Sequence, residues 1–187
     1  ISFSPRKNGN TVALLEEVLK GARSAGAEGE LFSTADKSIQ PCDGCWACTR
    51  GAGNCHIKDD MASLGEKMLN ADGIVFGTPV YFYGMTAQAK AVMDRSLALG
   101  SPERSLANKV GAVVATAGSL GLADTLKDFI FYMVTRRMLV AGYVAAYPGS
   151  PEELRKMEKC MQAAADLGRT MVALVKSGFR YPLELMG

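Results

Sequence analysis

Short apolar runs alternate with amphipathic segments along almost the whole chain. The runs 73–78 and 109–116 are nearly continuous in apolar residues, which is typical of strands buried on both faces of a parallel sheet. Between the runs, apolar residues recur at the three- and four-residue spacing of helices. The predicted strands are 1–4, 30–34, 73–78, 109–116 and 139–147, and the predicted helices are 11–25, 61–69, 85–99, 124–138 and 150–177.

This alternation predicts an α/β fold, in which right-handed crossovers place helices on both faces of a parallel sheet. Ligands of such open sheets bind beyond the carboxyl ends of the strands, where the strand order reverses. Two helix starts are also marked in the sequence. Asp59 and Asp60 can cap the helix that follows them, and Ser150 can cap the next one, which has Pro151 at its first position.

Composition and charge narrow the class of protein. The 187 residues, 48% of them hydrophobic, suit a single domain over 1–187. The formal charge of +2 and the lack of basic runs argue against a nucleic-acid partner. No apolar stretch is long enough for a membrane span and no signal-peptide pattern opens the chain, so a cytoplasmic location is expected. The sequence begins at Ile1 without Met, inside a predicted strand, and we expect residues to precede it.

The loop after the first predicted strand offers groups that bind a phosphate. It reads Ser4-Pro5-Arg6-Lys7-Asn8-Gly9-Asn10-Thr11 and leads directly into a helix. Free N–H groups at the helix start and the Arg6 guanidinium suit an anion. The loop is neither a dinucleotide fingerprint nor a triphosphate loop, so a monophosphate is the better interpretation. The alternative is an ordinary capped helix with a solvated Arg-Lys pair.

Two further loops at the same sheet edge predict a slot for a planar ring. The loop 79–84 places three aromatic side chains after a buried strand, where they can stack on a heterocycle. Small residues in 117–121 let the backbone approach the ring. Subunit packing would also explain the aromatics, and the second loop could be a plain turn. The candidate contacts are Pro79, Val80, Tyr81, Phe82, Tyr83, Gly84, Ala117, Gly118, Ser119 and Gly121.

Four of the five cysteines form the pattern C-x2-C-x2-C-x6-C, at Cys42, Cys45, Cys48 and Cys55. In a cytoplasmic protein such a cluster favours metal or redox chemistry over structural disulfides. Soft thiolates suit an iron-sulfur cluster or zinc. From the residues alone, a [4Fe-4S] cluster, reduced thiols without metal, and zinc or disulfides remain open. We interpret His56, the single histidine, as a surface side chain, not a ligand.

These segments together resemble the NADPH-dependent FMN reductase superfamily, and within it the iron-sulfur flavoproteins of anaerobic prokaryotes. The resemblance covers nearly the whole chain and rests on Ser4 to Lys7 with Asn10-Thr11, Pro41-Cys42 through Cys55, Asp59-Asp60-Met61, Ala71 to Ile74, Pro79-Val80-Tyr81, and Lys90 with Asp94-Arg95. It implies a flavodoxin-like three-layer sandwich with a five-stranded parallel sheet of order 2-1-3-4-5, the cysteine-rich loop 41–56 being an insertion. It also implies homodimers or homotetramers.

The resemblance further implies the roles of the candidate residues. The FMN phosphate would lie against Ser4, Arg6, Asn10 and Thr11, and the ring between 79–84 and 117–121. Cys42, Cys45, Cys48 and Cys55 would ligate a [4Fe-4S] cluster near a flavin.

We therefore expect an FMN-dependent oxidoreductase or electron-transfer flavoprotein. NAD(P)H or ferredoxin would donate electrons, and a small molecule or protein would accept them. No carboxylate pair or Ser-His arrangement stands out, so no catalytic acid or base is assigned. The alternatives are a redox-sensing or electron-carrying flavin module without independent turnover, and a cluster-free quinone reductase.

Overall fold

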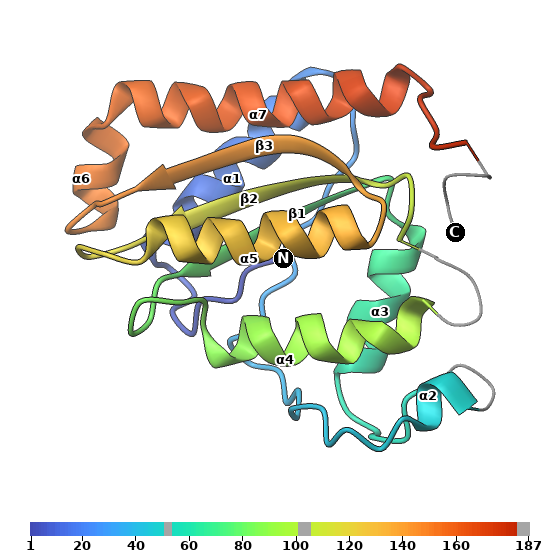
Figure 1. Ribbon diagram of the computed structural model, residues 1–187. Helices are drawn as coiled ribbons and strands as arrows, with labels where there is room; N and C mark the ends of the chain where they lie inside the picture. Colours follow the sequence, from blue (N-terminus) through green and yellow to red (C-terminus); the bar gives the residue numbers. More distant parts are fainter. Residues whose placement is uncertain (51–53, 101–105, 183–187) are drawn as a thin grey trace.

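A parallel sheet lies at the centre of the computed structural model, which describes residues 1–50, 54–100 and 106–182. Its strands are β1 (Gly73–Pro79), β2 (Val110–Thr116) and β3 (Leu139–Ala146), in the order β1-β2-β3 (Figure 1). Every residue of β2 is buried, as its continuous apolar run predicts for a central strand. The parallel sheet expected from the sequence is therefore confirmed.

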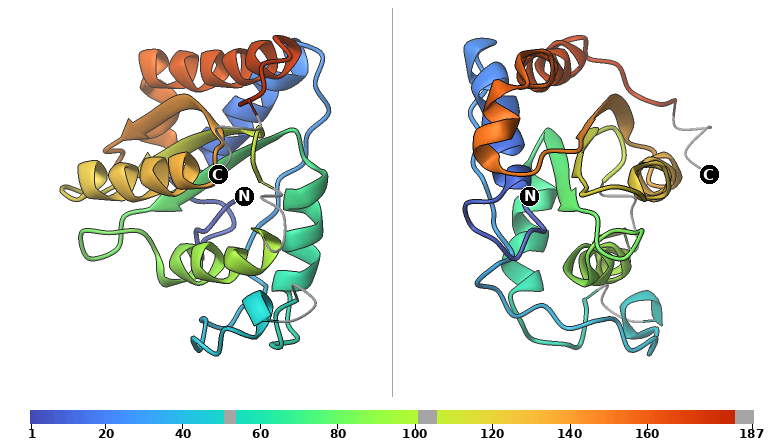
Figure 2. Two further views of the ribbon diagram at one scale, coloured as in Figure 1. Left: turned by 45° about the vertical axis from the view of Figure 1, so that its right-hand side comes forward. Right: turned by 90° about the vertical axis from the view of Figure 1, so that its left-hand side faces the viewer.

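Helices cover both faces of this sheet (Figures 1 and 2). The described helices are α1 (Asn10–Ser24), α2 (Ala47–Arg50), α3 (Met61–Asn70), α4 (Ala87–Arg95), α5 (Leu122–Thr135), α6 (Pro151–Lys156) and α7 (Glu158–Lys176), with a 3-10 turn over Ser96–Gly100. The buried residues of α1 and α7 form one core with Val110, Ala112 and Val114. Those of α3, α4 and α5 form a second core with Val113 and Ala115. Alternate side chains of β2 thus enter opposite cores, which gives three layers.

The expected five-stranded sheet needs a correction, because the described residues form a sheet of three strands and not five. Ser2 makes single parallel bridges to Ser33 on one side and to Gly77 on the other. The backbone N–H of Ser2 donates to Phe32 O at 2.7 Å, and that of Phe3 donates to Gly77 O at 2.7 Å. Each pairing is a single bridge, and Pro5, which has no N–H to donate, cannot extend it on the carboxyl side.

The last predicted helix and the predicted capping of α3 also differ from the structure. The predicted helix 150–177 is divided at Met157, whose ψ of 69° is not helical, although Ser150 caps its start as expected by accepting a hydrogen bond from Glu153 N at 3.2 Å. Before α3, Asp59 accepts a hydrogen bond from the Met61 N–H at 3.1 Å, whereas the Asp60 side chain accepts one from Ser38 N instead of capping the helix.

In the part of the chain that the structure describes, no helix is both long and apolar enough to span a membrane.

Candidate functional site

The predicted phosphate loop, 4–11, and the two predicted ring loops, 79–84 and 117–121, follow the carboxyl ends of extended segments. Hydrogen bonds connect them there. Thr11 Oγ1, in the first turn of α1, is hydrogen-bonded to Thr116 Oγ1 at the end of β2, at 2.9 Å. Val80 N donates to Thr116 O at 2.7 Å, and Asn10 Nδ2 donates to Pro148 O, after β3, at 3.2 Å. The fold therefore gathers segments from distant parts of the chain at one edge of the sheet, as expected for a ligand site of this class.

The loop before α1 has the features of an anion site. Ser4 is buried and its Oγ accepts a hydrogen bond from Arg6 N at 3.1 Å, which turns the chain, while the Arg6 side chain is exposed. Gly9 is the N-cap residue of α1, so no side chain caps the helix, and no acidic residue lies in its first turn. The N–H groups of that turn keep their partial positive charge for a ligand.

Asn10 supplies an independent indication of a missing partner. Its Oδ1 is buried and accepts no hydrogen bond from any described residue, whereas its Nδ2 is bonded. A buried polar atom without a partner is costly, and a bound ligand or water is the usual partner of such an atom. A ligand that carries a hydroxyl or other donor beside its phosphate would therefore fit the loop.

The loop 79–84 is a tight turn that presents aromatic side chains to solvent. Tyr81 N donates to Gly84 O at 2.8 Å, and Gly84 N donates back to Tyr81 O at 3.2 Å. Both central residues, Phe82 and Tyr83, have positive φ, of 45° and 69°, a conformation that is strained for bulky side chains. Phe82 is 96% exposed and its ring lies 5.4 Å from that of Tyr83. Strained backbone and exposed aromatics together are typical of a ligand-binding turn.

The loop 117–121 lies directly against this turn. Gly121 has a φ of +89°, and a Cβ built on it would come within 2.6 Å of Tyr83 Cα, so the two backbones are in close contact. Gly118 and Ser119 are exposed, and a Cβ on Gly118 would meet no atom within 4 Å among the described residues. Ala117 is buried, and Pro79 and Val80 are half-buried. The loop 117–121, predicted to form one wall of the slot, is thus packed at Gly121 and open at Gly118.

The cysteine loop forms a separate site. Thr86, which caps the start of α4, donates to Phe3 O at 3.1 Å beside the ligand loops, whereas Arg95, the last residue of α4, lies beside the cysteines. The nine residues of α4 correspond to about 14 Å of helix. Within one chain, the two sites therefore lie at opposite ends of this helix.

The four clustered cysteines line one small cavity of about 80 Å³. Cys42 and Cys45 are exposed, and Cys48 and Cys55 are half-buried. All five cysteines of the chain, including Cys160 on α7, are free thiols in the structure. The loop thus brings together the four thiols that the sequence singled out and leaves the fifth apart.

The spacing of these groups bears on which metal they suit. Four sulfur ligands of one zinc ion, at bonds of about 2.3 Å, lie roughly 4 Å from one another. Among the described residues, the set of potential ligand atoms within 4.8 Å of one another comprises Asp43, Cys45 and His56, and not the cysteine quartet. A four-iron cluster binds each thiolate at a different iron and needs wider spacing. The described side chains are therefore not arranged as a four-sulfur zinc site, and the four thiols that line the cavity are the kind of donor set that a [4Fe-4S] cluster needs.

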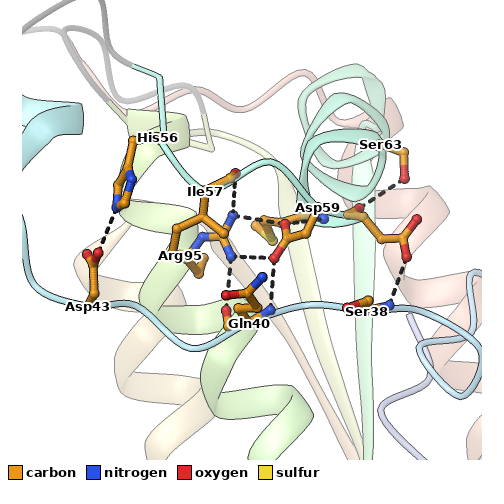
Figure 3. A network of polar contacts seen from close by, with 10 residues as sticks. Ser38, Gln40, Asp43, His56, Ile57, Asp59, Ser63 and Arg95 are labelled. Atoms are coloured by element: carbon orange, nitrogen blue, oxygen red, sulfur yellow. Dashed lines mark hydrogen bonds and ion pairs between the residues drawn. The ribbon is translucent and has the colours of Figure 1, made fainter.

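Polar contacts hold the two sides of the cysteine loop (Figure 3). His56 Nε2 and Asp43 Oδ2 are 2.7 Å apart, and both side chains are about half exposed. Hydrogen bonds from Cys45 and from His56 lower the pKa of the Asp43 carboxyl. A hydrogen bond from Ala47 N lowers the pKa of the Cys45 thiol, but Asp43 and other neighbours outweigh it and raise the pKa overall.

A buried ion pair beside the cavity is the main feature that the sequence analysis missed. The side chains of Arg95 and Asp59 are 1% and 3% exposed, and their closest atoms are 2.8 Å apart. Burial would raise the pKa of Asp59, but hydrogen bonds from Arg95 and from two backbone N–H groups outweigh it and lower the pKa below 3.8. The sequence predicts Asp59 as a helix cap and assigns no role to Arg95. An arginine that ends a short amphipathic helix gives no signal of its partner.

Comparison with known proteins gives three kinds of match. The family described as NADPH-dependent FMN reductase matches residues 1–152. An iron-sulfur flavoprotein of Methanocaldococcus jannaschii is 38% identical over 94% of this chain and 95% of its own length. Among solved structures, the NAD(P)H:quinone oxidoreductase from Methanothermobacter marburgensis has a TM-score of 0.70 at 16% identity, covering 89% of this chain and 93% of that one. An archaeal flavodoxin has a TM-score of 0.60 at 19% identity, covering 91% of this chain and 94% of that one. At these sequence identities, the two solved structures show the fold alone.

Proposed function

The chain belongs to the NADPH-dependent FMN reductase family, and from that premise we propose that its strand-end loops bind FMN and its four clustered cysteines hold a [4Fe-4S] cluster. It is an FMN-dependent oxidoreductase with a flavodoxin-like α/β fold. The observation that carries the cluster proposal is the single cavity lined by all four cysteines. The name of the Methanocaldococcus relative, an iron-sulfur flavoprotein, supports it.

We assign the FMN phosphate to the loop before α1. Arg6 is exposed and can pair with the phosphate, and the uncapped first turn of α1 points N–H groups at the same region. Asn10 Oδ1 can accept a hydrogen bond from a hydroxyl of the ligand, because it has no partner among the described residues. Ser4 and Thr11 hold the loop in shape through their hydrogen bonds.

The flavin ring is assigned to the slot between the two other loops. Tyr81, Phe82 and Tyr83 would shield it from one side, and the open backbone at Gly118 and Ser119 would approach its edge. When bound, FMN supplies hydride and single-electron chemistry. The chain's own residues bind and orient the cofactor.

The finer points of this function are proposals as well. We propose that NAD(P)H or ferredoxin donates the electrons and that the protein is a homodimer or homotetramer. The bridges of Ser2 to Ser33 and to Gly77 support a sheet of order 2-1-3-4-5 in one domain over residues 1–187, with two very short strands.

Anaerobic purification followed by iron, sulfide and FMN assays on one sample tests both assignments. We expect one FMN and about four irons per chain, and dithionite should bleach the visible absorbance of both groups. Catalytic oxidation of NADPH or NADH with a soluble acceptor would separate an enzyme from a carrier that needs its protein partner.

The cysteine assignment has a matched control within the chain. Cys48→Ser should lose most of the iron and sulfide and keep FMN, whereas Cys160→Ser should keep both, because Cys160 lies on α7 outside the cavity. Flavin without iron in the unsubstituted protein, even after reconstitution with iron and sulfide, would leave an FMN reductase without a cluster. A protein unable to bind added FMN would refute the assignment of the loops.

A further inference from the structure

The guanidinium of Arg95 joins the two ends of the cysteine loop. Its NH1 donates to Gln40 O at 2.9 Å, just before the first clustered cysteine, and its NH2 donates to Ile57 O at 3.2 Å, just after the last one. Both nitrogens also donate to the carboxylate of Asp59, at 2.8 and 3.0 Å (Figure 3). One side chain thus fastens both walls of the cavity to the end of α4.

Four of the five N–H groups of Arg95 are used in these contacts, and the fifth is left over. Its Nε is buried and has no hydrogen-bond partner among the described residues. Arg95 lines the cavity together with the four cysteines. Asp59 is the main cause that raises the pKa of Arg95, and the neighbouring Cys55 thiol contributes to the same shift. The free donor therefore belongs to a side chain that borders the sulfur atoms.

Burial makes this arrangement costly for a purely structural role. A buried ion pair gains little stability over apolar packing, and a buried donor without an acceptor adds a further cost. The other ionisable side chains at the cavity, apart from its cysteines, are Asp43, Asp94 and His56, so Arg95 is the one permanent cation among the described residues that line it. Asp59 already compensates the guanidinium charge, and a negatively charged acceptor within reach of Nε would satisfy the remaining donor.

We propose that Arg95 is a positioning residue for the cysteine ligands and an electrostatic partner of the cluster, raising its reduction potential through its charge and its Nε–H. This inference rests on the proposed [4Fe-4S] cluster. Four thiolates make such a cluster anionic, and hydrogen bonds to its sulfurs and nearby positive charge stabilise the reduced form, which carries one more negative charge.

Charge-changing substitutions of the two partners test the proposal, because they predict opposite shifts. Arg95→Gln leaves the Asp59 carboxylate unpaired beside the cluster, so the midpoint potential should fall. Asp59→Asn leaves the Arg95 charge uncompensated, so the potential should rise. Arg95→Lys keeps the charge but lacks Nε–H, and its potential should lie between those of Arg95→Gln and the unsubstituted protein.

The measurement is a redox titration of the iron-sulfur signal by electron paramagnetic resonance on anaerobic holoprotein, with iron and FMN counted per chain. Arg136→Gln is the control, because Arg136 contacts Ser96 next to Arg95 but does not line the cavity. Its potential should not change. FMN content reports folding, since the FMN loops lie at the other end of α4.

Each outcome decides between the proposals. Shifts of the same sign in Arg95→Gln and Asp59→Asn, or a potential in Arg95→Lys equal to that of the unsubstituted protein, would overturn the role of Arg95. Loss of both FMN and iron in Arg95→Gln and Arg95→Lys would mean that Arg95 only supports the fold, and this result would also overturn the proposed role of Arg95. An unsubstituted protein that takes up no iron would instead refute the cluster assignment itself.

Discussion

Gly118 and Gly121 lie in the same loop, yet a methyl group added to each meets different surroundings. At Gly121, with its φ of +89°, the Cβ would overlap the backbone of Tyr83, at 2.6 Å from Cα and 2.7 Å from O. The left-handed conformation costs an alanine about 1–2 kcal/mol, and the overlap adds about 1–3 kcal/mol of overpacking. At Gly118 the Cβ meets no described atom within 4 Å, and its φ is not positive.

These surroundings predict that the two alanine substitutions affect different properties. Gly121→Ala should destabilise the FMN-free protein by roughly 3 kcal/mol, which lowers its Tm by about 6–12 °C for a chain of this length. Gly118→Ala should change the stability of the FMN-free protein by less than about 0.5 kcal/mol. It should weaken FMN binding by about 1–3 kcal/mol, or roughly 5- to 150-fold in Kd, because the methyl group enters the proposed ring slot.

Thermal unfolding of the FMN-free proteins and titration with FMN by fluorescence quenching measure the two effects separately. An unchanged Tm for Gly121→Ala would mean that the loops 79–84 and 117–121 are not in contact. Unchanged FMN affinity for Gly118→Ala would mean that the loop is a plain turn and that the ring binds elsewhere. Weak binding in both variants with equal losses of stability would make the two glycines equivalent, which contradicts their surroundings.

Two further predictions concern the electrostatics of the sites. Arg6→Ala should weaken binding of FMN by about 1.5–3 kcal/mol, roughly 10- to 150-fold, and leave binding of riboflavin, which lacks the phosphate, unchanged in calorimetric titrations. Lys7→Ala should have little effect on either ligand, because among the described residues the ion pair of Lys7 is an exposed contact with Asp36 at 3.4 Å. Equal losses for FMN and riboflavin in Arg6→Ala would exclude the phosphate role of Arg6. Because the pKa of Asp59 is lowered in the folded protein, its carboxylate stabilises the fold above about pH 3.8, and this contribution is lost as the pH falls through the folded pKa. Urea unfolding from pH 7 to pH 3 should therefore show that the stability deficit of Asp59→Asn shrinks below pH 4, whereas a deficit independent of pH would mean that the carboxylate charge is not involved.

The sequence predicts the parts of this fold that burial dictates. The runs 73–78 and 109–116 form strands at the predicted places because their apolar character reflects burial on both faces of the sheet. No feature of the sequence predicts the break of the last helix at Met157. The neighbouring residues are good helix formers, and the non-helical ψ is confined to one residue. The first two extended segments carry strand-like patterns, but a pattern gives no length of pairing, and Ser2 forms only one bridge on each side.

The candidate sites show the same division between local and tertiary information. Cysteine spacing identifies possible ligands because the four residues lie in one short loop that can converge without help from the rest of the fold. The residue that holds this loop cannot be found in that way, since Arg95 lies 36 positions from Asp59 and 55 positions from Gln40. Two of its acceptors are backbone carbonyls, which every residue type provides, so no side-chain pattern could mark them. The buried guanidinium with its unpartnered donor can be recognised only when the fold has placed the end of α4 against the cysteine loop. This tertiary contact, more than the cysteine pattern, determines the electrostatic interaction of the cavity with a negatively charged group.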